Sequence, residues 1–365
     1  MNRKAHFLVP LVLFAVAVFA QDQPSFPHPT GEGTYVVHNY RFQDGETLPT
    51  LNLHYYTYGT PQYDASGRTT NAVLILHGTG GSGLQFVRPQ FAGVLFGPGQ
   101  LLDVGKYFII LPDNVGHGKS SKPSDGLHMK FPHYDYADMV ALQHVLLTQA
   151  LKVNHLKLVM GTSMGCMHSW MWAEDYPDFV DDALPLACLP VQIAGRNRMM
   201  RRMAMDSITT DPAWDHGEYK QQPPGLRGAL EMLLIMGSSP LQMQKNFPTA
   251  QKADAFLENF LANGMKHYDA NDFLYQFDAS RDYDPSAKLG DIKARVYFIN
   301  SADDYINPPE LGIAQEEIKK VKHGRFILLP ITDQTRGHGT HTLPAIWGKY
   351  LGELLQHPYG VNIDF

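Results

Sequence analysis

The chain has 365 residues, enough for one large α/β domain or two small ones. A hydrophobic content of 44% and a charged content of 18% are typical of a globular protein with a substantial core. The net charge is −6 and no run of Lys or Arg marks a nucleic-acid surface, so no nucleic-acid partner is expected. The nearest basic cluster, Arg196-Asn197-Arg198 with Arg201-Arg202, alternates with methionines and is better explained as an amphipathic helix.

The first twenty residues form a targeting pattern. Arg3 and Lys4 precede an apolar stretch over residues 7–20, and Val18-Phe19-Ala20 offers small residues at the −3 and −1 positions of a cleavage site. This pattern predicts a secretory signal peptide over residues 1–20, and therefore an exported, periplasmic or extracellular protein. The stretch is too short for a transmembrane helix and is interrupted by Pro10, and no other segment reaches membrane-spanning length, so no stable membrane insertion is expected.

Apolar runs that predict buried strands alternate with helical stretches along the chain. Each run is short, β-branched or aromatic, and bounded by turn residues, as in a parallel sheet covered on both faces. The predicted strands are residues 72–76, 107–111, 156–160, 183–187, 296–299 and 326–329. Met139, Leu142, Leu146 and Ala150 recur at helical spacing, which predicts a crossover helix over residues 138–151. The fold class is therefore α/β with a mostly parallel, doubly wound sheet.

Residues 191–286 break this rhythm. The interval is Met-rich, helical in pattern and interrupted by Pro223-Pro224. It predicts a helical cap inserted between the sixth and seventh strands, which divides the core into residues 21–190 and 287–365. A separate domain is the alternative, but no flexible linker flanks the interval.

A candidate nucleophile, Ser163, lies between a predicted strand and a helical stretch in Gly161-Thr162-Ser163-Met164-Gly165. In a G-x-S-x-G turn the serine sits on a strained strand-to-helix corner, and the two glycines let strand and helix approach closely. The motif alone is weak evidence, but the strand before it and the helix after it are the context that it requires.

A glycine-rich loop, His77-Gly78-Thr79-Gly80-Gly81, follows the strand over residues 72–76. Such a loop supplies one backbone N–H of an oxyanion hole, and the residue after the nucleophile supplies the other. This nominates Thr79, with Gly80 as the alternative, together with Met164. His77 is expected to brace the loop rather than to transfer protons.

The acid and base of a triad should follow the serine in the order Asp, His. Asp303 and Asp304 come just after the predicted strand at residues 296–299, and either could orient an imidazole. His338 is the candidate base and His341 its rival. Their H-x-x-H spacing lacks an accompanying carboxylate or Cys ligand set, so no metal is expected. Triad chemistry needs no organic cofactor, so none is expected either.

Two cysteines are present, Cys166 and Cys188. An exported protein could join them, but two cysteines in a chain of this size do not form a disulfide framework. We therefore expect two buried, small, apolar side chains.

With these motifs in order, the chain resembles the homoserine O-acetyltransferases and their α/β-hydrolase relatives over residues 35–355. The motifs that carry the resemblance are Leu53-His54-Tyr55-Tyr56-Thr57-Tyr58-Gly59, Gly97-Pro98-Gly99, Leu102-Asp103, Tyr107-Phe108-Ile109-Ile110, Asn114, Asp138-Met139-Val140, Ser163-Met164-Gly165, Ile208-Thr209-Thr210-Asp211-Pro212-Ala213-Trp214 and Gly225-Leu226. The resemblance implies an α/β-hydrolase fold and a possible homodimer through the cap. It also implies Asp304, four residues before Pro308, as the triad acid, and His338, after Gly337, as the base.

Three departures bear on function. Gly339 stands where the acetyltransferases have an Asp after the catalytic His, and the Arg that they associate with the substrate carboxylate falls on Leu230. A family Tyr falls on Gly237. A zwitterion such as homoserine needs buried, matched charges. We therefore expect an apolar pocket with Gly80 and Leu230 among its substrate-binding residues, and Met232, Leu233, Leu234 and Met236 nearby.

The leading functional hypothesis is an exported serine hydrolase that cleaves uncharged or weakly polar small-molecule carboxylic esters. An O-acyltransferase, in which an alcohol replaces water as the acyl acceptor, is the first alternative. A non-catalytic binding protein that keeps the fold is the second alternative. Export favours hydrolysis, because acetyl-CoA and methionine biosynthesis are cytoplasmic.

Overall fold

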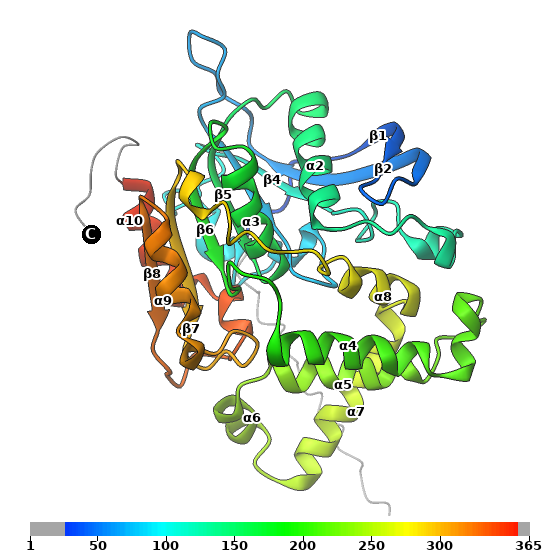
Figure 1. The fold of residues 1–365 in the computed structure, drawn as a ribbon. Helices are drawn as coiled ribbons and strands as arrows, with labels where there is room; N and C mark the ends of the chain where they lie inside the picture. Colours follow the sequence, from blue (N-terminus) through cyan, green and yellow to red (C-terminus); the bar gives the residue numbers. More distant parts are fainter. Residues whose placement is uncertain (1–25, 357–365) are drawn as a thin grey trace, which may run out of the picture.

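The computed structural model describes residues 26–356, and the predicted signal peptide lies outside them. Within this part the chain forms an eight-stranded sheet in the order β1-β2-β4-β3-β5-β6-β7-β8 (Figure 1). Strand β2 pairs antiparallel with β1 and β4, and all other neighbours are parallel. The strands are β1 (Gly31–Arg41), β2 (Thr47–Tyr58), β3 (Ala72–Leu76), β4 (Phe108–Pro112), β5 (Leu156–Thr162), β6 (Val180–Leu186), β7 (Arg295–Ser301) and β8 (Gly324–Leu329).

The predicted α/β class is confirmed. All six predicted strands form, and β3 has the predicted bounds. Strands β1 and β2 were not predicted. Along β1, half-buried residues alternate with exposed ones and polar side chains are frequent, so this edge strand has no continuous apolar run.

Helices cover both faces of the sheet. Leu74 and Leu76 of β3 belong to one buried cluster, and Val73 and Ile75 to another, because successive side chains of a strand point to opposite faces. The first cluster includes residues of α2 (Tyr136–Val145), α3 (Met164–Asp175) and α9 (Ile313–Glu317). The second includes residues of α1 (Ala92–Leu95) and α10 (Pro344–Gln356). The crossover helix predicted over residues 138–151 is α2 followed by one π-helical turn, Leu146–Ala150.

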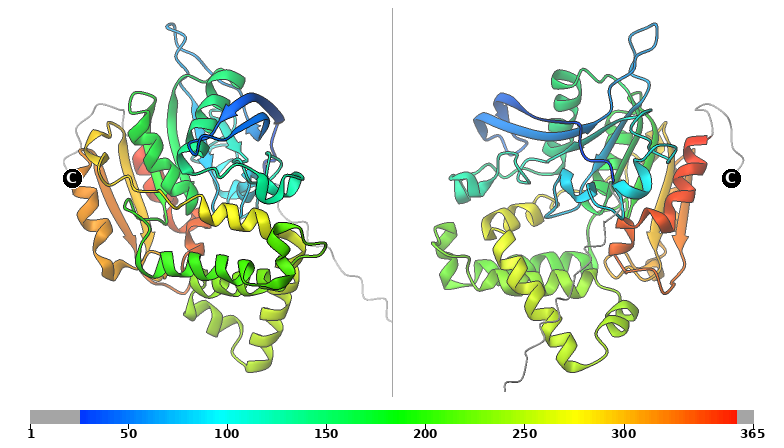
Figure 2. Two further views of the ribbon diagram at one scale, coloured as in Figure 1. Left: turned by 45° about the vertical axis from the view of Figure 1, so that its right-hand side comes forward. Right: turned by 180° about the vertical axis from the view of Figure 1, so that it is seen from behind.

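Five α-helices between β6 and β7 lie together at one end of the sheet (Figures 1 and 2). They are α4 (Gly195–Thr209), α5 (Gly225–Gly237), α6 (Pro240–Asn246), α7 (Ala250–His267) and α8 (Ala270–Asp278). We refer to α4–α8 as the cap. The cap has its own buried apolar cluster, which includes Leu226, Leu261 and Phe273. Ile306, from the loop after β7, packs into this cluster and joins the cap to the sheet. None of the helices described between residues 26 and 356 is both long and apolar enough to cross a membrane.

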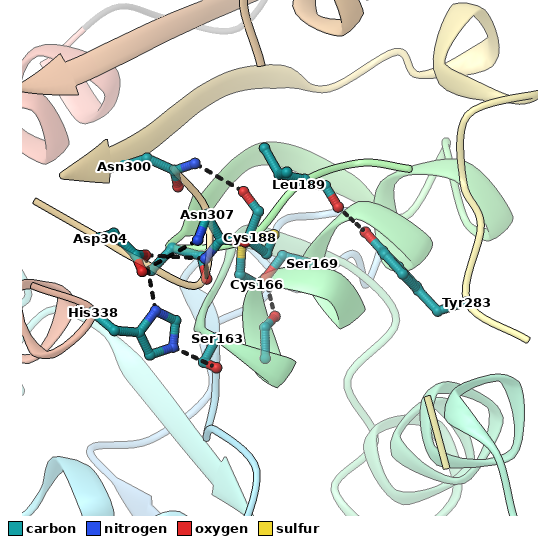
Figure 3. The surroundings of a disulfide bond; sticks show 12 residues. Ser163, Cys166, Ser169, Cys188, Leu189, Tyr283, Asn300, Asp304, Asn307 and His338 are labelled. Carbon is teal, nitrogen blue, oxygen red and sulfur yellow. Dashed lines mark hydrogen bonds and ion pairs between the residues drawn. A yellow bond between two sulfur atoms is a disulfide. The ribbon is translucent and has the colours of Figure 1, made fainter. Parts of the chain in front are cut away.

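Cys166 and Cys188 form a disulfide, so the prediction of two unlinked apolar side chains is wrong (Figure 3). Cys166 lies in the first turn of α3, and Cys188 follows β6. The pairing of β5 with β6 extends to Ser163, whose N–H donates to the Leu186 carbonyl over 2.9 Å. This brings the two Cα atoms within 5.8 Å. The pairing thus depends on strand register, which the spacing of the cysteines does not reveal.

Candidate active site

Ser163 occupies a strained corner between β5 and α3. Its φ of 56° and ψ of −111° lie in a region that L-residues other than glycine rarely adopt. The flanking glycines, Gly161 and Gly165, are required because a side chain at either position would collide with neighbouring backbone. A Cβ on Gly161 would collide with the backbone of Gly165, and a Cβ on Gly165 would collide with the Leu76 carbonyl of β3. The corner thus presents the Ser163 hydroxyl at the carboxyl end of the sheet.

His338 joins Ser163 to Asp304 (Figure 3). Its Nε2 lies 2.8 Å from Ser163 Oγ, and its Nδ1 lies 2.8 Å from Asp304 Oδ2. Because a carboxylate accepts, Nδ1 carries the proton and Nε2 is free to accept the serine hydroxyl proton. The three residues chosen from the sequence therefore meet in one hydrogen-bonded chain, although they follow three different strands.

Asp304 is buried, with a relative exposure of 1%. Burial opposes ionisation, but His338 and hydrogen bonds from Asn307 Nδ2 and the Ile306 N–H together hold the pKa of this carboxyl below its ordinary value. Asp304 therefore remains a carboxylate that can orient the imidazole and stabilise its protonated form.

Asp303 has a different task from its neighbour. Its Oδ1 accepts a hydrogen bond from Ser301 Oγ at 2.5 Å, and its Oδ2 accepts the Gly337 N–H at 2.9 Å. It therefore holds the backbone next to His338 but does not contact the ring, which resolves the choice that the sequence left open. This positioning role was missed, since a carboxylate after a strand is equally typical of a turn.

His341 packs edge-on against His338, with ring centroids 5.0 Å apart. Burial, and then His338, lower the pKa of His341 to about 3, so the ring is neutral. The structure brings His338, and not this rival, to Ser163. Among residues 26–356 there is no group of three or more His, Cys, Asp or Glu side chains placed to hold a metal ion.

The glycine-rich loop is oriented by His77, as expected. His77 Nδ1 donates to the Gly78 carbonyl over 2.9 Å, and its Nε2 accepts the Asn114 N–H over 3.2 Å. Burial lowers the pKa of His77, which favours this neutral form. In a trans peptide the carbonyl and the following N–H point in opposite directions. The bond to Gly78 therefore directs the Thr79 N–H away from His77.

Gln85 ties the same loop to the nucleophile corner. Its Oε1 accepts the Gly78 N–H over 3.1 Å, and its Nε2 donates to Thr162 Oγ1 over 2.9 Å. A Cβ on Gly78 would lie 3.4 Å from the Ser163 Cβ, so loop and serine are adjacent. Within residues 26–356 the N–H groups of Thr79 and Met164 have no hydrogen-bond acceptor. Both are available to an oxyanion. The sequence did not identify Gln85.

A cavity of about 820 Å³ opens beside Ser163. Its wall comes from the glycine-rich loop, the corner, the loop of His338 and the cap, and it includes the predicted Gly80. Leu230 was wrongly assigned to this wall. It is fully buried inside the cap against Gly264, and Leu233, three residues later, faces the cavity instead. The two positions lie about one helical turn apart in α5, so the cap was aligned with the resembling family about one turn out of register.

The expectation of an apolar pocket is also wrong in part. Leu233, Met200 and Phe260 line the cavity, but so do charged side chains. The charged residues on the wall are Arg88, Lys122, Arg201, Asp269 and Asp272. Arg201, Asp269 and Asp272 belong to the interval predicted as the cap, but no charged residue was predicted to line the pocket.

Comparisons with known proteins agree with this architecture. The family described as alpha/beta hydrolase fold matches residues 71–323. Homoserine O-acetyltransferase from Pelobacter propionicus is 32% identical over 340 residues, covering 83% of this chain and 90% of that protein. The enzyme of the same name from Pasteurella multocida is 32% identical over 302 residues, covering 72% of this chain and 80% of that protein.

Solved structures of similar fold include both acyltransferases and hydrolases. A homoserine O-acetyltransferase from Bacillus anthracis has a TM-score of 0.78 at 21% identity and covers 91% of this chain and 99% of that one. An acetylester hydrolase from Corynebacterium glutamicum has a TM-score of 0.78 at 22% identity and covers 90% of this chain and 96% of that one. These structural likenesses concern the fold. Together with the sequence relatives, they place the chain in the α/β-hydrolase superfamily and, within it, in the homoserine O-acetyltransferase-like family.

Proposed function

We propose that the protein is an exported serine hydrolase that cleaves carboxylic esters through an acyl-enzyme on Ser163. The observation that carries the proposal is the continuous hydrogen-bonded chain from Ser163 through His338 to the buried Asp304. Such a chain activates a hydroxyl that is otherwise a weak nucleophile. No metal or organic cofactor enters this chemistry.

In the first half of the reaction, Ser163 Oγ attacks the ester carbonyl while His338 Nε2 takes the hydroxyl proton. The negative charge that develops on the carbonyl oxygen is stabilised by the N–H groups of Thr79 and Met164, at about 3 kcal/mol for each donor. His338 then donates its proton to the departing alcohol oxygen. The carbonyl carbon is left bonded to Ser163 as an acyl-enzyme.

In the second half, His338 removes a proton from water as the water oxygen attacks the acyl carbon. The tetrahedral intermediate occupies the same pair of N–H groups, and its collapse returns the proton to Ser163 Oγ. The products are a carboxylic acid and the alcohol released earlier. Asp304 keeps the imidazole oriented and balances its charge in both halves.

Export is part of the proposal. The signal-peptide pattern over residues 1–20 supports it. The disulfide between Cys166 and Cys188 gives independent support, because disulfides persist mainly in oxidising compartments. An exported enzyme does not meet acetyl-CoA, and Gly339 replaces the Asp that follows the catalytic His in the acetyltransferases. Both points favour water as the acyl acceptor.

The second candidate function is O-acyl transfer to an alcohol. The identity of 32% to homoserine O-acetyltransferase from Pelobacter propionicus favours it, and the first half of the chemistry is unchanged. The two functions differ only in what attacks the acyl-enzyme. Product analysis of an ester reaction with and without an added alcohol, including homoserine, separates acid from transferred ester.

The proposal is tested by hydrolysis of p-nitrophenyl acetate by the Ser163→Ala variant. Without the nucleophile, kcat should fall on the order of 10⁴-fold or more. The matched control is Ser169→Ala, which removes a hydroxyl of the adjoining helix α3 that donates to the Gly165 carbonyl over 2.8 Å. This control should keep most of the activity. Full activity in Ser163→Ala would refute the proposal.

A further inference from the structure

A buried cation on the cavity wall lacks an acidic partner. Arg201 of α4 has a relative exposure of 3% and lines the cavity beside Ser163. Within residues 26–356, no carboxylate forms an ion pair with it. The next residue, Arg202, is exposed and does have an acidic partner, since its Nε lies 2.6 Å from Asp206 Oδ1. Burying a guanidinium without a counter-ion lowers the stability of the folded protein, so Arg201 is not explained by stability alone.

The guanidinium is held in one orientation. Arg201 Nε donates to Asn197 Oδ1 over 3.0 Å, and Nη1 donates to Ser280 Oγ over 3.1 Å. The Ser280 hydroxyl in turn donates to the Phe277 carbonyl, so it offers Arg201 a lone pair. The guanidinium carbon lies 5.5 Å from the centre of the Phe277 ring. These neutral contacts use two of the five N–H donors and leave the charge uncompensated.

The acids of the cavity do not supply the missing charge. Asp272 accepts hydrogen bonds from the N–H and the hydroxyl of Ser124, and burial raises its pKa to about 6. Asp269 accepts from Tyr219 and Gln222 over 2.7 and 2.9 Å. Both carboxyls already have local donors. Within residues 26–356, neither carboxyl forms an ion pair with Arg201, whose positive charge is therefore left without a counter-ion in the free protein.

Helix α8 connects this cation to the ester-cleaving end of the cavity. It packs against α4 (Figure 1) and carries Phe277, which contacts Arg201. The preceding residue, Gln276, also lines the cavity, and its Oε1 would lie 3.6 Å from a Cβ on Gly80 of the glycine-rich loop. One small molecule can therefore reach from the region of Arg201 to Ser163 in the same cavity.

We propose that Arg201 binds a carboxylate of the substrate, so that the esters cleaved at Ser163 carry a carboxylate on a part remote from the scissile carbonyl. This inference rests on the proposed ester hydrolysis. A guanidinium can donate two parallel N–H hydrogen bonds to a carboxylate, and the attraction between the two groups is stronger where water is excluded. The substrate carboxylate is then the counter-ion that Arg201 lacks in the free protein. The uncharged esters expected from the sequence are therefore the poorer substrates.

The experiment compares charged and neutral esters of equal length. Monomethyl adipate against methyl hexanoate tests a carboxylate on the acyl side, and 4-acetoxybutanoate against butyl acetate tests the alcohol side. Each kcat/KM is measured by pH-stat in the wild type, in Arg201→Met and in the matched control Arg202→Met. In one of the two pairs, Arg201→Met should lower the charged-to-neutral ratio about tenfold to a hundredfold, and Arg202→Met should leave it unchanged.

Two further measurements separate the possible failures. Arg201→Lys keeps a charge and should retain part of the preference, whereas a purely structural loss would affect both esters equally. Binding of adipate to Ser163→Ala, measured by calorimetry, requires no catalysis and should disappear on adding Arg201→Met. If no ester is hydrolysed but adipate binds, the proposed hydrolysis fails and the anion site stands. Equal losses on charged and neutral esters, with no adipate binding, would overturn the assignment of Arg201.

Discussion

At the scale of single residues, the adjacent carboxylates of Asp303 and Asp304 have different roles. Asp304 contacts the His338 ring, and Asp303 holds the Gly337 backbone before it. Because the pKa of Asp304 is held below its ordinary value of 3.8, the carboxylate stays charged at neutral pH. Its contribution to folding stability is present above that value and is lost as the pH falls through the lowered pKa.

Asp304→Asn should lower kcat for ester hydrolysis about 10³- to 10⁴-fold, because an amide does not hold His338 in the required tautomer. Asp303→Asn should lower kcat far less, about tenfold, since it weakens only the anchoring of the backbone next to His338. Steady-state kinetics on one activated ester compares the two variants. A loss in Asp303→Asn that equals or exceeds the loss in Asp304→Asn would contradict the division of tasks.

At the scale of elements, the features that depend on a local sequence pattern could be predicted, namely the buried parallel strands and the strand-to-helix corner. The buried parallel strands have apolar runs, and the corner at Ser163 has glycines that no other residue could replace. The edge strand β1 and its neighbour β2 have no such run and were not predicted. The disulfide was missed as well, because the approach of Cys166 and Cys188 depends on the register of β5 against β6.

Replacing both cysteines with alanine should lower the free energy of unfolding by about 3 kcal/mol, because the disulfide closes a loop of 22 residues in the unfolded chain. Denaturant unfolding of the double variant and of the wild type measures the difference. Wild-type protein unfolded in excess reductant is the control and should show the same lowered stability. A double variant as stable as the oxidised wild type would rule out a stabilising role for this bond.

At the scale of the whole molecule, the chemistry of the cavity was the least predictable feature. Its wall is assembled from segments between Gly78 and Thr342. Helical periodicity does place Arg201 on the stripe of Ala204 and Ile208, where a charge is unusual. This position is consistent with the amphipathic helix predicted from the sequence, but it does not show what the stripe faces. Whether a stripe faces a core or a cavity depends on how α4 packs on α8, which periodicity does not determine.

The fold alone does not decide between acyl transfer and hydrolysis, since similar structures include an acetyltransferase and an ester hydrolase. Both activities share one requirement, a nucleophilic Ser163 activated by His338. Activation of Ser163 by His338 can be measured directly by chemical labelling.

The most direct measurement is labelling with a fluorophosphonate, followed by peptide mass spectrometry to locate the adduct. An activated serine displaces fluoride from phosphorus and forms a stable bond through its oxygen. We predict one adduct per chain, on Ser163, and no labelling of His338→Ala under the same conditions. Absence of an adduct on Ser163 in the folded wild type, or equal labelling of the His338→Ala variant, would contradict the account.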